Sequence, residues 1–372
     1  MDYRDIRHFT RFNALRFLAA SLVLVHHAES LRVQAGLFNL KGLGLFQNGS
    51  TAVSFFFVLS GFLITYLLLK EERQTGTVHI GRFYLKRVYR IWPLYFLMVF
   101  VGVFLQPWAI EMLGLGYRLP YTWGETWHHF LFFFPGLVTF FHGPHLLQPL
   151  WSIGVEEVFY LIWAPLFLWF GKRLMAMFLT VIAVKLALIS ADGLLGFPPV
   201  IGYLVRILEF QSMAAGAIAA HLLFHHGTLL KKILARLTIL PWLLAGLAIL
   251  LLVNPFTDAA PWIEFRTRNG FFSMIESTLF AALLLCLALT NRKSRWLDSG
   301  AANFLGDISY GIYMYHLLVV TIVMELLKTM SIHPLIDTLV FYALSFGITI
   351  LLAGLSKRHF EDYFLRFKKR LG

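Results

Sequence analysis

Charged residues are scarce in this sequence, and cysteine is almost absent. Of the 372 residues, only 14% are charged and 58% are hydrophobic. Soluble domains usually hold about 25% charged and about 45–50% apolar residues, so a mean hydropathy of +0.70 excludes a water-soluble enzyme and a disordered chain. The single cysteine, Cys286, excludes an internal disulfide.

Long apolar runs recur along the chain and predict an all-α, polytopic helical bundle in a membrane. A helix of about twenty mainly apolar residues crosses a bilayer. The candidate spans are 12–30, 51–69, 91–106, 149–170, 174–190, 201–223, 239–253, 271–289, 304–327 and 334–355. A further run, 129–141, is too short to cross comfortably, so we expect a re-entrant or interfacial segment there.

The distribution of positive charge predicts the orientation. If the N-terminus is cytoplasmic, ten spans place most of the 32 Lys and Arg residues in cytoplasmic segments, as the positive-inside rule requires. We therefore expect both termini in the cytoplasm, one integral-membrane domain over 1–372 and a short cytoplasmic tail, 356–372. This bias, together with anionic membrane lipids, explains the net charge of +12, and no nucleic-acid partner is needed.

Two ionisable residues of the first predicted span share one face. Arg16 and His27 are eleven residues apart, which on a helix means about 20° of rotation and about 16 Å of rise. The neighbouring His26 lies about 80° from Arg16 on the helical wheel. Charges inside spans are costly and mark functional sites by default. The alternative is a snorkelling arginine and an interfacial histidine.

Two adjacent carboxylates, Glu156 and Glu157, lie about two turns into the fourth predicted span, at a depth similar to that of His27. A carboxylate there needs a cation or donors around it. Pairing with His27 would raise the basicity of the imidazole, as a general base requires. The alternative is a structural ion pair.

A dense cationic segment precedes the third predicted span. Its members are Arg82, Lys86, Arg87 and Arg90. Such a cluster suits phosphate groups, which the planar guanidinium binds in a bidentate manner. The alternative is ordinary positive-inside topology.

Polar side chains also open the ninth predicted span, where Tyr310 and His316 stand out. Most such groups join helices in lipid, but we keep Tyr310 and His316 as second-tier site residues, with Ser60 as a possible oxyanion donor. With one cysteine and scattered histidines, the sequence indicates no metal site.

Five short motifs occur in order along the chain. They are Arg16-(ten residues)-His27, Ser54-Phe55-Phe56-Phe57-Val58-Leu59-Ser60-Gly61-Phe62-Leu63-Ile64, Arg87-Val88-Tyr89-Arg90 followed by Ile91-Trp92-Pro93, Trp151-Ser152-(three residues)-Glu156-(two residues)-Phe159-Tyr160, and Ser309-Tyr310 with His316. Together they resemble the motifs of the acyltransferase-3 family of bacterial integral-membrane O-acyltransferases. We expect a stand-alone member, without the soluble esterase-like domain that some members carry.

The resemblance implies transfer of an acyl group, most often acetyl, from cytoplasmic acetyl-CoA or another acyl-CoA. The acceptor would be a hydroxyl of a cell-surface or lipid-linked carbohydrate, and the location the bacterial cytoplasmic membrane. His27 would be the catalytic histidine, Arg16 its motif partner in the catalytic site, and Glu156 an essential or supporting catalytic carboxylate. The cluster around Arg87 and Arg90 would bind the donor.

A secondary transporter is the main alternative, because it too would bury arginine, histidine and glutamate near the middle of the membrane. A protein that moves acyl groups across the membrane for another enzyme is a third possibility. Both would act without acyl turnover of their own.

Overall fold

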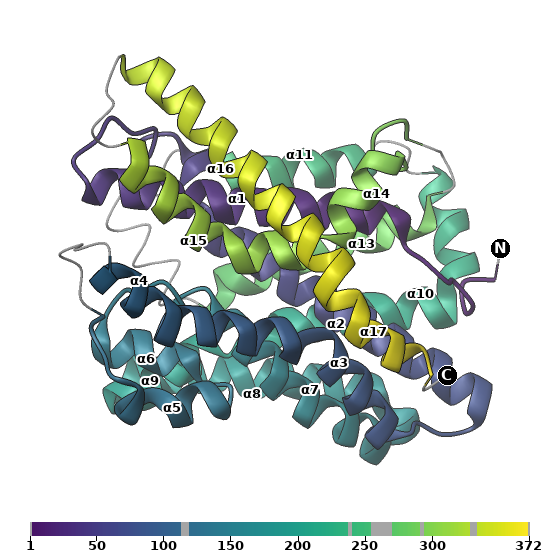
Figure 1. Cartoon of the computed structure of the whole chain (residues 1–372). Coiled ribbons are helices and arrows are strands. Elements are labelled where there is room, and N and C mark those ends of the chain that lie inside the picture. The colour runs from purple at the N-terminus through teal and green to yellow at the C-terminus, as the bar shows by residue number, and fades with distance from the viewer. Residues whose placement is uncertain are drawn as a thin grey trace. The chain divides into compact units, whose positions relative to one another are not determined.

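The computed structural model describes residues 2–112, 119–236, 240–253, 270–290, 294–327 and 333–370. Within these residues every regular element is a helix (Figure 1), and seven helices are long and apolar enough to cross a membrane. This confirms the predicted all-α, polytopic class. The count of ten spans stays a prediction.

The chain divides into two compact units, each built from segments that are far apart in the sequence. Unit 1 comprises Met1–Val78 and Ala164–Ser309, and unit 2 comprises His79–Trp163 and Tyr310–Gly372. Each unit is therefore held together by long-range packing between helices.

Unit 1 is organised around a long helix, α10, that packs on α2, α8 and α13. Its helices are α1 (Thr10–Gln34), α2 (Gly49–Thr75), α8 (Leu174–Leu195), α9 (Pro199–Ile207), α10 (Phe210–Arg236), α11 (Leu240–Val253), α13 (Gly270–Leu289) and α14 (Gly300–Asp307). Two short 3-10 turns, η1 (Gly44–Phe46) and η3 (Gly171–Arg173), complete the described elements.

Helices α2 and α10 approach each other through a reciprocal pair of glycines. A Cβ atom on Gly61 would lie 1.9 Å from the carbonyl oxygen of Met213, and a Cβ on Gly216 would lie 1.9 Å from the carbonyl oxygen of Val58. Small residues at helix interfaces in membranes allow the backbones this proximity, which dispersion forces then stabilise.

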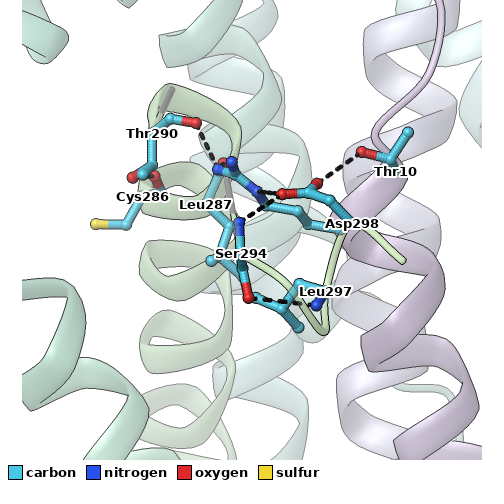
Figure 2. A network of polar contacts seen from close by, with 8 residues as sticks. Thr10, Cys286, Leu287, Thr290, Ser294, Leu297 and Asp298 are labelled. Atoms are coloured by element: carbon cyan, nitrogen blue, oxygen red, sulfur yellow. Dashed lines mark hydrogen bonds and ion pairs between the residues drawn. The ribbon is translucent and has the colours of Figure 1, made fainter. Parts of the chain in front are cut away.

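A polar network fixes the start of α1 to the segment that follows α13 (Figure 2). The Asp298 carboxylate accepts hydrogen bonds from the Ser294 N–H at 2.9 Å, the Thr10 hydroxyl at 3.2 Å and the Arg11 Nε at 3.3 Å. Arg11 also donates to the Thr290 carbonyl oxygen, at the end of α13, at 2.5 Å. The network therefore fixes the N-terminal end of α1, the helix that carries Arg16 and His27, against the segment after α13.

We expect this network to make the stability of the protein depend on pH. Burial opposes ionisation, but the Ser294 N–H and the Arg11 guanidinium outweigh it and hold the pKa of Asp298 below its usual value. Because this pKa is lowered in the folded state, the stabilisation is present above about pH 4 and is lost as the pH falls through the folded pKa. Asp298→Asn should cost about 1 kcal/mol near neutral pH and flatten the acid limb of the melting temperature against pH in detergent. An acid limb identical to that of the wild type would contradict this assignment.

Two predicted spans are interrupted in the structure. Span 201–223 divides into α9 and α10 around Leu208, and span 304–327 divides at Ile308 into α14 and α15 (Ser309–Leu327). At the first break the Lys185 ammonium donates to the carbonyl oxygens of Val205 and Leu208, the latter at 2.6 Å, and so satisfies backbone acceptors that the interrupted helix leaves open. Hydropathy alone reports an apolar run and does not register such a break.

Unit 2 is built around α3 and α7. Its described elements are α3 (Ile80–Phe100), η2 (Val101–Leu105), α4 (Gln106–Met112), α5 (Trp123–Leu131), α6 (Pro135–His142), most of α7 (Leu150–Phe170), α15, α16 (Pro334–Ser356), η4 (Lys357–Glu361) and α17 (Asp362–Lys369). The segments η2 and η4 are single π-helical turns, a feature found often at functional sites.

The eleventh apolar run, 129–141, lies in two short helices, α5 and α6, neither of them long enough to cross a bilayer. Phe133, between them, has a φ of 60°. A Cβ on Gly154 of α7 would lie 2.4 Å from the Phe133 carbonyl oxygen, so this glycine lets the turn rest on α7. The short segment is thus fixed against the helix that carries Glu156.

Candidate active site

Helix α1 carries the first pair of predicted site residues. It runs without interruption from Thr10 to Gln34, so the helical geometry expected for Arg16 and His27 holds: about 16 Å of rise on nearly one face. Both side chains are half-buried. The catalytic role of His27 and the supporting role of Arg16 remain proposals.

His26 and His27 have different surroundings. A Cβ on Gly49 would lie 2.7 Å from the Cγ and Cδ2 atoms of His26, so the His26 ring lies directly on the first turn of α2. The two imidazole rings meet edge to face, with centroids 5.3 Å apart. This contact gives His26 a role in packing, and the choice of His27 over His26 as the site residue stays a prediction.

The charged residues that follow His27 form a buried structural pair. Glu29 is fully buried and lies 3.8 Å from the Arg32 guanidinium. Glu29 also accepts a hydrogen bond from the Leu40 N–H, and Arg32 donates to the Phe38 carbonyl oxygen at 2.8 Å. These bonds tie the loop after α1 back onto the helix.

Ser60, the possible oxyanion donor, lies on α2 beside Gly61 and is half-buried. The glycine of the same motif, Gly61, is explained by packing, because it allows α2 to approach α10 closely. Its role as an oxyanion donor therefore remains a prediction.

In unit 2 the structure brings together two motifs that lie about seventy residues apart. The Arg87 guanidinium carbon lies 5.8 Å from the ring centroid of Phe83 and 5.9 Å from that of Tyr160, within the range of cation–π attraction. The Tyr160 hydroxyl donates to the Glu156 carboxylate at 2.7 Å. The predicted donor-binding arginine and the predicted supporting carboxylate thus belong to one cluster, with Tyr160 between them.

Glu157, which the sequence left unassigned, joins the same cluster. It accepts a hydrogen bond from the Trp92 indole at 2.9 Å and interacts electrostatically with Arg87. The Arg87 Nε and the Glu157 Oε1 are buried, and neither has a hydrogen-bond partner among the described residues. Buried polar atoms without partners are rare, and a catalytic or ion-binding role is one explanation for them.

The motif that contains Ser309, Tyr310 and His316 lies at the start of α15, and this part of α15 contacts both α3 and the start of α7. The Tyr310 hydroxyl donates to the Ile91 carbonyl oxygen of α3 at 2.9 Å. The Tyr313 hydroxyl is bonded to Ser152 at 2.8 Å and donates to the Pro149 carbonyl oxygen at 2.9 Å. His316 is fully buried, with its Nδ1 bonded to the Tyr313 carbonyl oxygen. Tyr310 and Tyr313 therefore join α15 to α3 and to the start of α7, whereas the Nδ1 bond of His316 lies within α15.

The basic residues predicted to precede the third span lie on α3, and three of the four are partly buried there. Arg82 is exposed, whereas Lys86, Arg87 and Arg90 are half-buried. All three of these cations interact electrostatically with Lys368 of α17. Sequence reasoning missed Lys368, because nothing in its local pattern separates it from the other basic residues of the tail.

Sequence reasoning also missed a second polar network, in unit 1. The Glu209 carboxylate, at the start of α10, accepts hydrogen bonds from Ser212 at 2.6 Å and from Gln211 at 2.8 Å. Ser212 and Gln211 bond in turn to Ser277 and Ser273 of α13, at 2.8 and 2.9 Å. The polar residues at 209, 211 and 212 were the available signal, and the network fastens α10 to α13.

Metal ligands do not gather in the described ranges: no three His, Cys, Asp or Glu side chains lie together there in a way that could hold an ion. Helices long and apolar enough to span a membrane, which carry tyrosines, carboxylates and arginines, define an integral-membrane protein with a candidate functional site in its helical bundle.

The acyltransferase domain that defines the acyltransferase-3 family matches residues 9–357, and the chain belongs to this family. It is therefore an acyltransferase. The predicted resemblance is confirmed, as is the assignment to a class of enzyme.

Several bacterial proteins are similar to this chain. The peptidoglycan O-acetyltransferase OatA of Listeria monocytogenes is 25% identical over 382 residues, covering 96% of this chain and 57% of OatA. The putative peptidoglycan O-acetyltransferase YrhL of Bacillus subtilis is 27% identical over 334 residues, covering 83% of this chain and 48% of YrhL. A putative O-acetyltransferase of Staphylococcus aureus, SACOL0978, is 25% identical over 381 residues, covering 97% of this chain and 58% of its own length.

The chain spans about half to three-fifths of the length of these relatives. No solved structure matches it significantly. The relatives and the spanning helices together indicate a multi-pass membrane protein.

Proposed function

We propose that this protein is a membrane-embedded O-acetyltransferase that moves an acetyl group from acetyl-CoA to a hydroxyl of a cell-envelope carbohydrate. The observation that carries the proposal is the cluster in unit 2. There Arg87, Tyr160 and Glu156 come from two distant motifs, and Tyr310 of a third motif bonds to the backbone of α3. Two of the similar proteins are described as peptidoglycan O-acetyltransferases, which supports a carbohydrate acceptor.

The donor is proposed to bind through Arg87 and Arg90. Acyl-CoA carries phosphates, and guanidinium groups bind phosphate through two parallel charge-assisted hydrogen bonds. The buried Arg87 Nε, which has no partner among the described residues, supports such a role. Lys86 adds positive charge to the same face of α3, and exposed Arg82 contributes to the field around it.

His27 is proposed to act as a general base. Its imidazole takes the proton of the acceptor hydroxyl while the oxygen attacks the thioester carbonyl. The C–S bond then breaks, coenzyme A leaves as a thiolate, and the imidazolium returns the proton to that sulfur. Arg16 supports the site through its positive charge, and Glu156 is proposed as an essential or supporting carboxylate. Ser60 or a tyrosine supplies the oxyanion donor.

The bacterial cytoplasmic membrane is the proposed location, with both termini in the cytoplasm. The positive-inside bias supports this orientation. It places the N-terminal part of α3, with its basic residues, on the side where acyl-CoA is available.

The test uses membranes from cells that express the chain, supplied with acetyl-CoA labelled in the acetyl group. We expect the label in a carbohydrate fraction, and a gain of one acetyl mass per modified site in the glycan mass spectrum. Membranes that contain the His27→Ala variant are the matched control and should leave the carbohydrate unlabelled. Flux of a substrate across the membrane without labelled carbohydrate would support the transporter alternative and overturn the proposal.

A further inference from the structure

The last described helix of the chain, α17, packs against the basic part of α3 (Figure 1). The rings of Tyr89 on α3 and Phe367 on α17 are stacked, with centroids 5.8 Å apart and planes inclined by 25°. Lys368 is the next residue after Phe367, so this stacking sets where the Lys368 backbone lies relative to α3. The contact lies wholly within unit 2.

Lys368 lies among positive charges. It interacts electrostatically with Lys86, Arg87 and Arg90 of α3 and with Lys357 of η4, and each of these interactions is repulsive. Lys368 is half-buried, and no hydrogen bond or ion pair connects it to another described residue. The ammonium group therefore lies in a strongly positive field.

The nearby carboxylates offset only part of this charge. Asp362 pairs with Lys357 at 2.7 Å, and buried Glu361 interacts with Lys357 and Arg90. Glu156 and Glu157 act on Arg87. None of these acidic groups is among the main electrostatic partners of Lys368.

Clustered like charges at a half-buried position destabilise the folded protein, and a multivalent anion between them would reverse the sign of this contribution. Phosphate groups fit the donor set, because arginine forks and lysine ammonium groups are the usual phosphate ligands in proteins. Coenzyme A carries a 3′-phosphate and a diphosphate, and so can engage several of these cations at once.

We propose that Lys368 and Lys357 of the C-terminal segment complete, with Lys86, Arg87 and Arg90, a binding site for the phosphate groups of the acyl-CoA donor. This inference rests on the proposed function and extends it by assigning a ligand-binding role to the tail after the last span. The chemistry recognised is that of phosphate, which membrane phospholipid headgroups share.

The test compares Lys368→Met with Arg366→Met. Arg366 lies on the same helix, is exposed and is not among the main electrostatic partners of Lys368, so its replacement removes the same charge without touching the proposed cluster. Binding of coenzyme A, 3′-dephospho-coenzyme A and pantetheine to the full chain is measured by calorimetry in zwitterionic nanodiscs. Lys368→Met should weaken coenzyme A binding about tenfold or more, which is the usual effect of losing one charge-assisted contact. Arg366→Met should bind like the wild type, and pantetheine, which lacks these phosphates, should bind equally to all three proteins.

Thermal stability gives a second readout. Without ligand, Lys368→Met should melt at or above the wild-type temperature, because repulsion among the cations is relieved, while coenzyme A should raise its melting temperature less than that of the wild type. A purely structural lysine would give the opposite result, a lower melting temperature in the absence of ligand. Lys357→Met is the second variant and should also weaken coenzyme A binding.

Wild-type affinity of Lys368→Met for coenzyme A would overturn the inference. If Lys368→Met lowers the affinity for phosphatidylglycerol nanodiscs and leaves coenzyme A binding unchanged, the assignment to the donor is overturned in favour of lipid headgroups. Acetyl transfer by the wild type with no effect of Lys368→Met would defeat this inference alone. Coenzyme A binding that depends on Lys368, without any acetyl transfer, would defeat the proposed function and leave the phosphate site in place.

Discussion

Replacing His27 by alanine is expected to lower acyl transfer about 10²–10⁴-fold, the range usual for loss of a general base. The acceptor hydroxyl would then have to attack without a group to take its proton, and no imidazolium would remain to protonate the leaving sulfur. The measurement is the initial rate of label transfer by purified protein with acetyl-CoA labelled in the acetyl group. A rate close to that of the wild type would remove His27 from the mechanism.

His26→Ala is the matched control, because it changes the same side chain at the adjacent position of α1. The His26 ring lies on the first turn of α2 at Gly49, so its loss should leave a packing defect and lower the melting temperature. Turnover per folded molecule should fall far less than in His27→Ala. If His26→Ala instead abolishes turnover while His27→Ala does not, the roles of the two histidines are reversed.

Gly61→Ala is expected to prevent stable folding of unit 1. The new methyl group would lie 1.9 Å from the Met213 carbonyl oxygen, a distance that side-chain rotation cannot relieve because the obstacle is backbone. Overpacking usually costs about 1–3 kcal/mol, and a clash between two helix backbones should exceed that range. Gly216→Ala should act similarly, since its methyl group would meet the Val58 carbonyl oxygen at the same distance. Folded yield after detergent extraction and the melting temperature are the measurements.

Gly246→Ala provides the control for this prediction. It lies within α11, and a Cβ there would meet nothing within 4 Å. Alanine is favoured over glycine inside a helix by about 0.5–1 kcal/mol, so this variant should be as stable as the wild type or slightly more stable. Equal stability of Gly61→Ala and Gly246→Ala would show that α2 and α10 do not approach as closely as the structure indicates.

Local signals in the sequence predicted most of the helices. The apolar runs at 12–30, 51–69 and 149–170 correspond to α1, α2 and α7, because twenty apolar residues in series leave few alternatives to a helix in lipid. The sequence did not predict the helix breaks inside the apolar runs 201–223 and 304–327. The interruption around Leu208 depends on the Lys185 ammonium, which comes from another helix to satisfy the open carbonyl groups.

The candidate site was predicted as separate motifs. Spacing on one helix, together with the family motif, favoured His27 over His26, because helical periodicity is a local property. This choice stays a prediction. The sequence could not show the contacts between α3 and α7, because these helices lie some seventy residues apart in the chain. Tyr160 contacts both Arg87 and Glu156, and Glu157 accepts a hydrogen bond from Trp92. The sequence also could not show that Lys368 of α17 lies near the basic residues of α3, because the two helices are far apart in the chain.

The sequence by itself determined that this chain is a helical membrane protein of the acyltransferase-3 family, because composition, charge asymmetry and short motifs are properties of consecutive residues. Only the tertiary structure decided which of its many charged residues meet, because the meeting of α3, α7, α15 and α17 depends on packing between segments far apart in the chain. Electrostatic energy falls with distance, so it is this packing that turns scattered basic and acidic residues into one cluster.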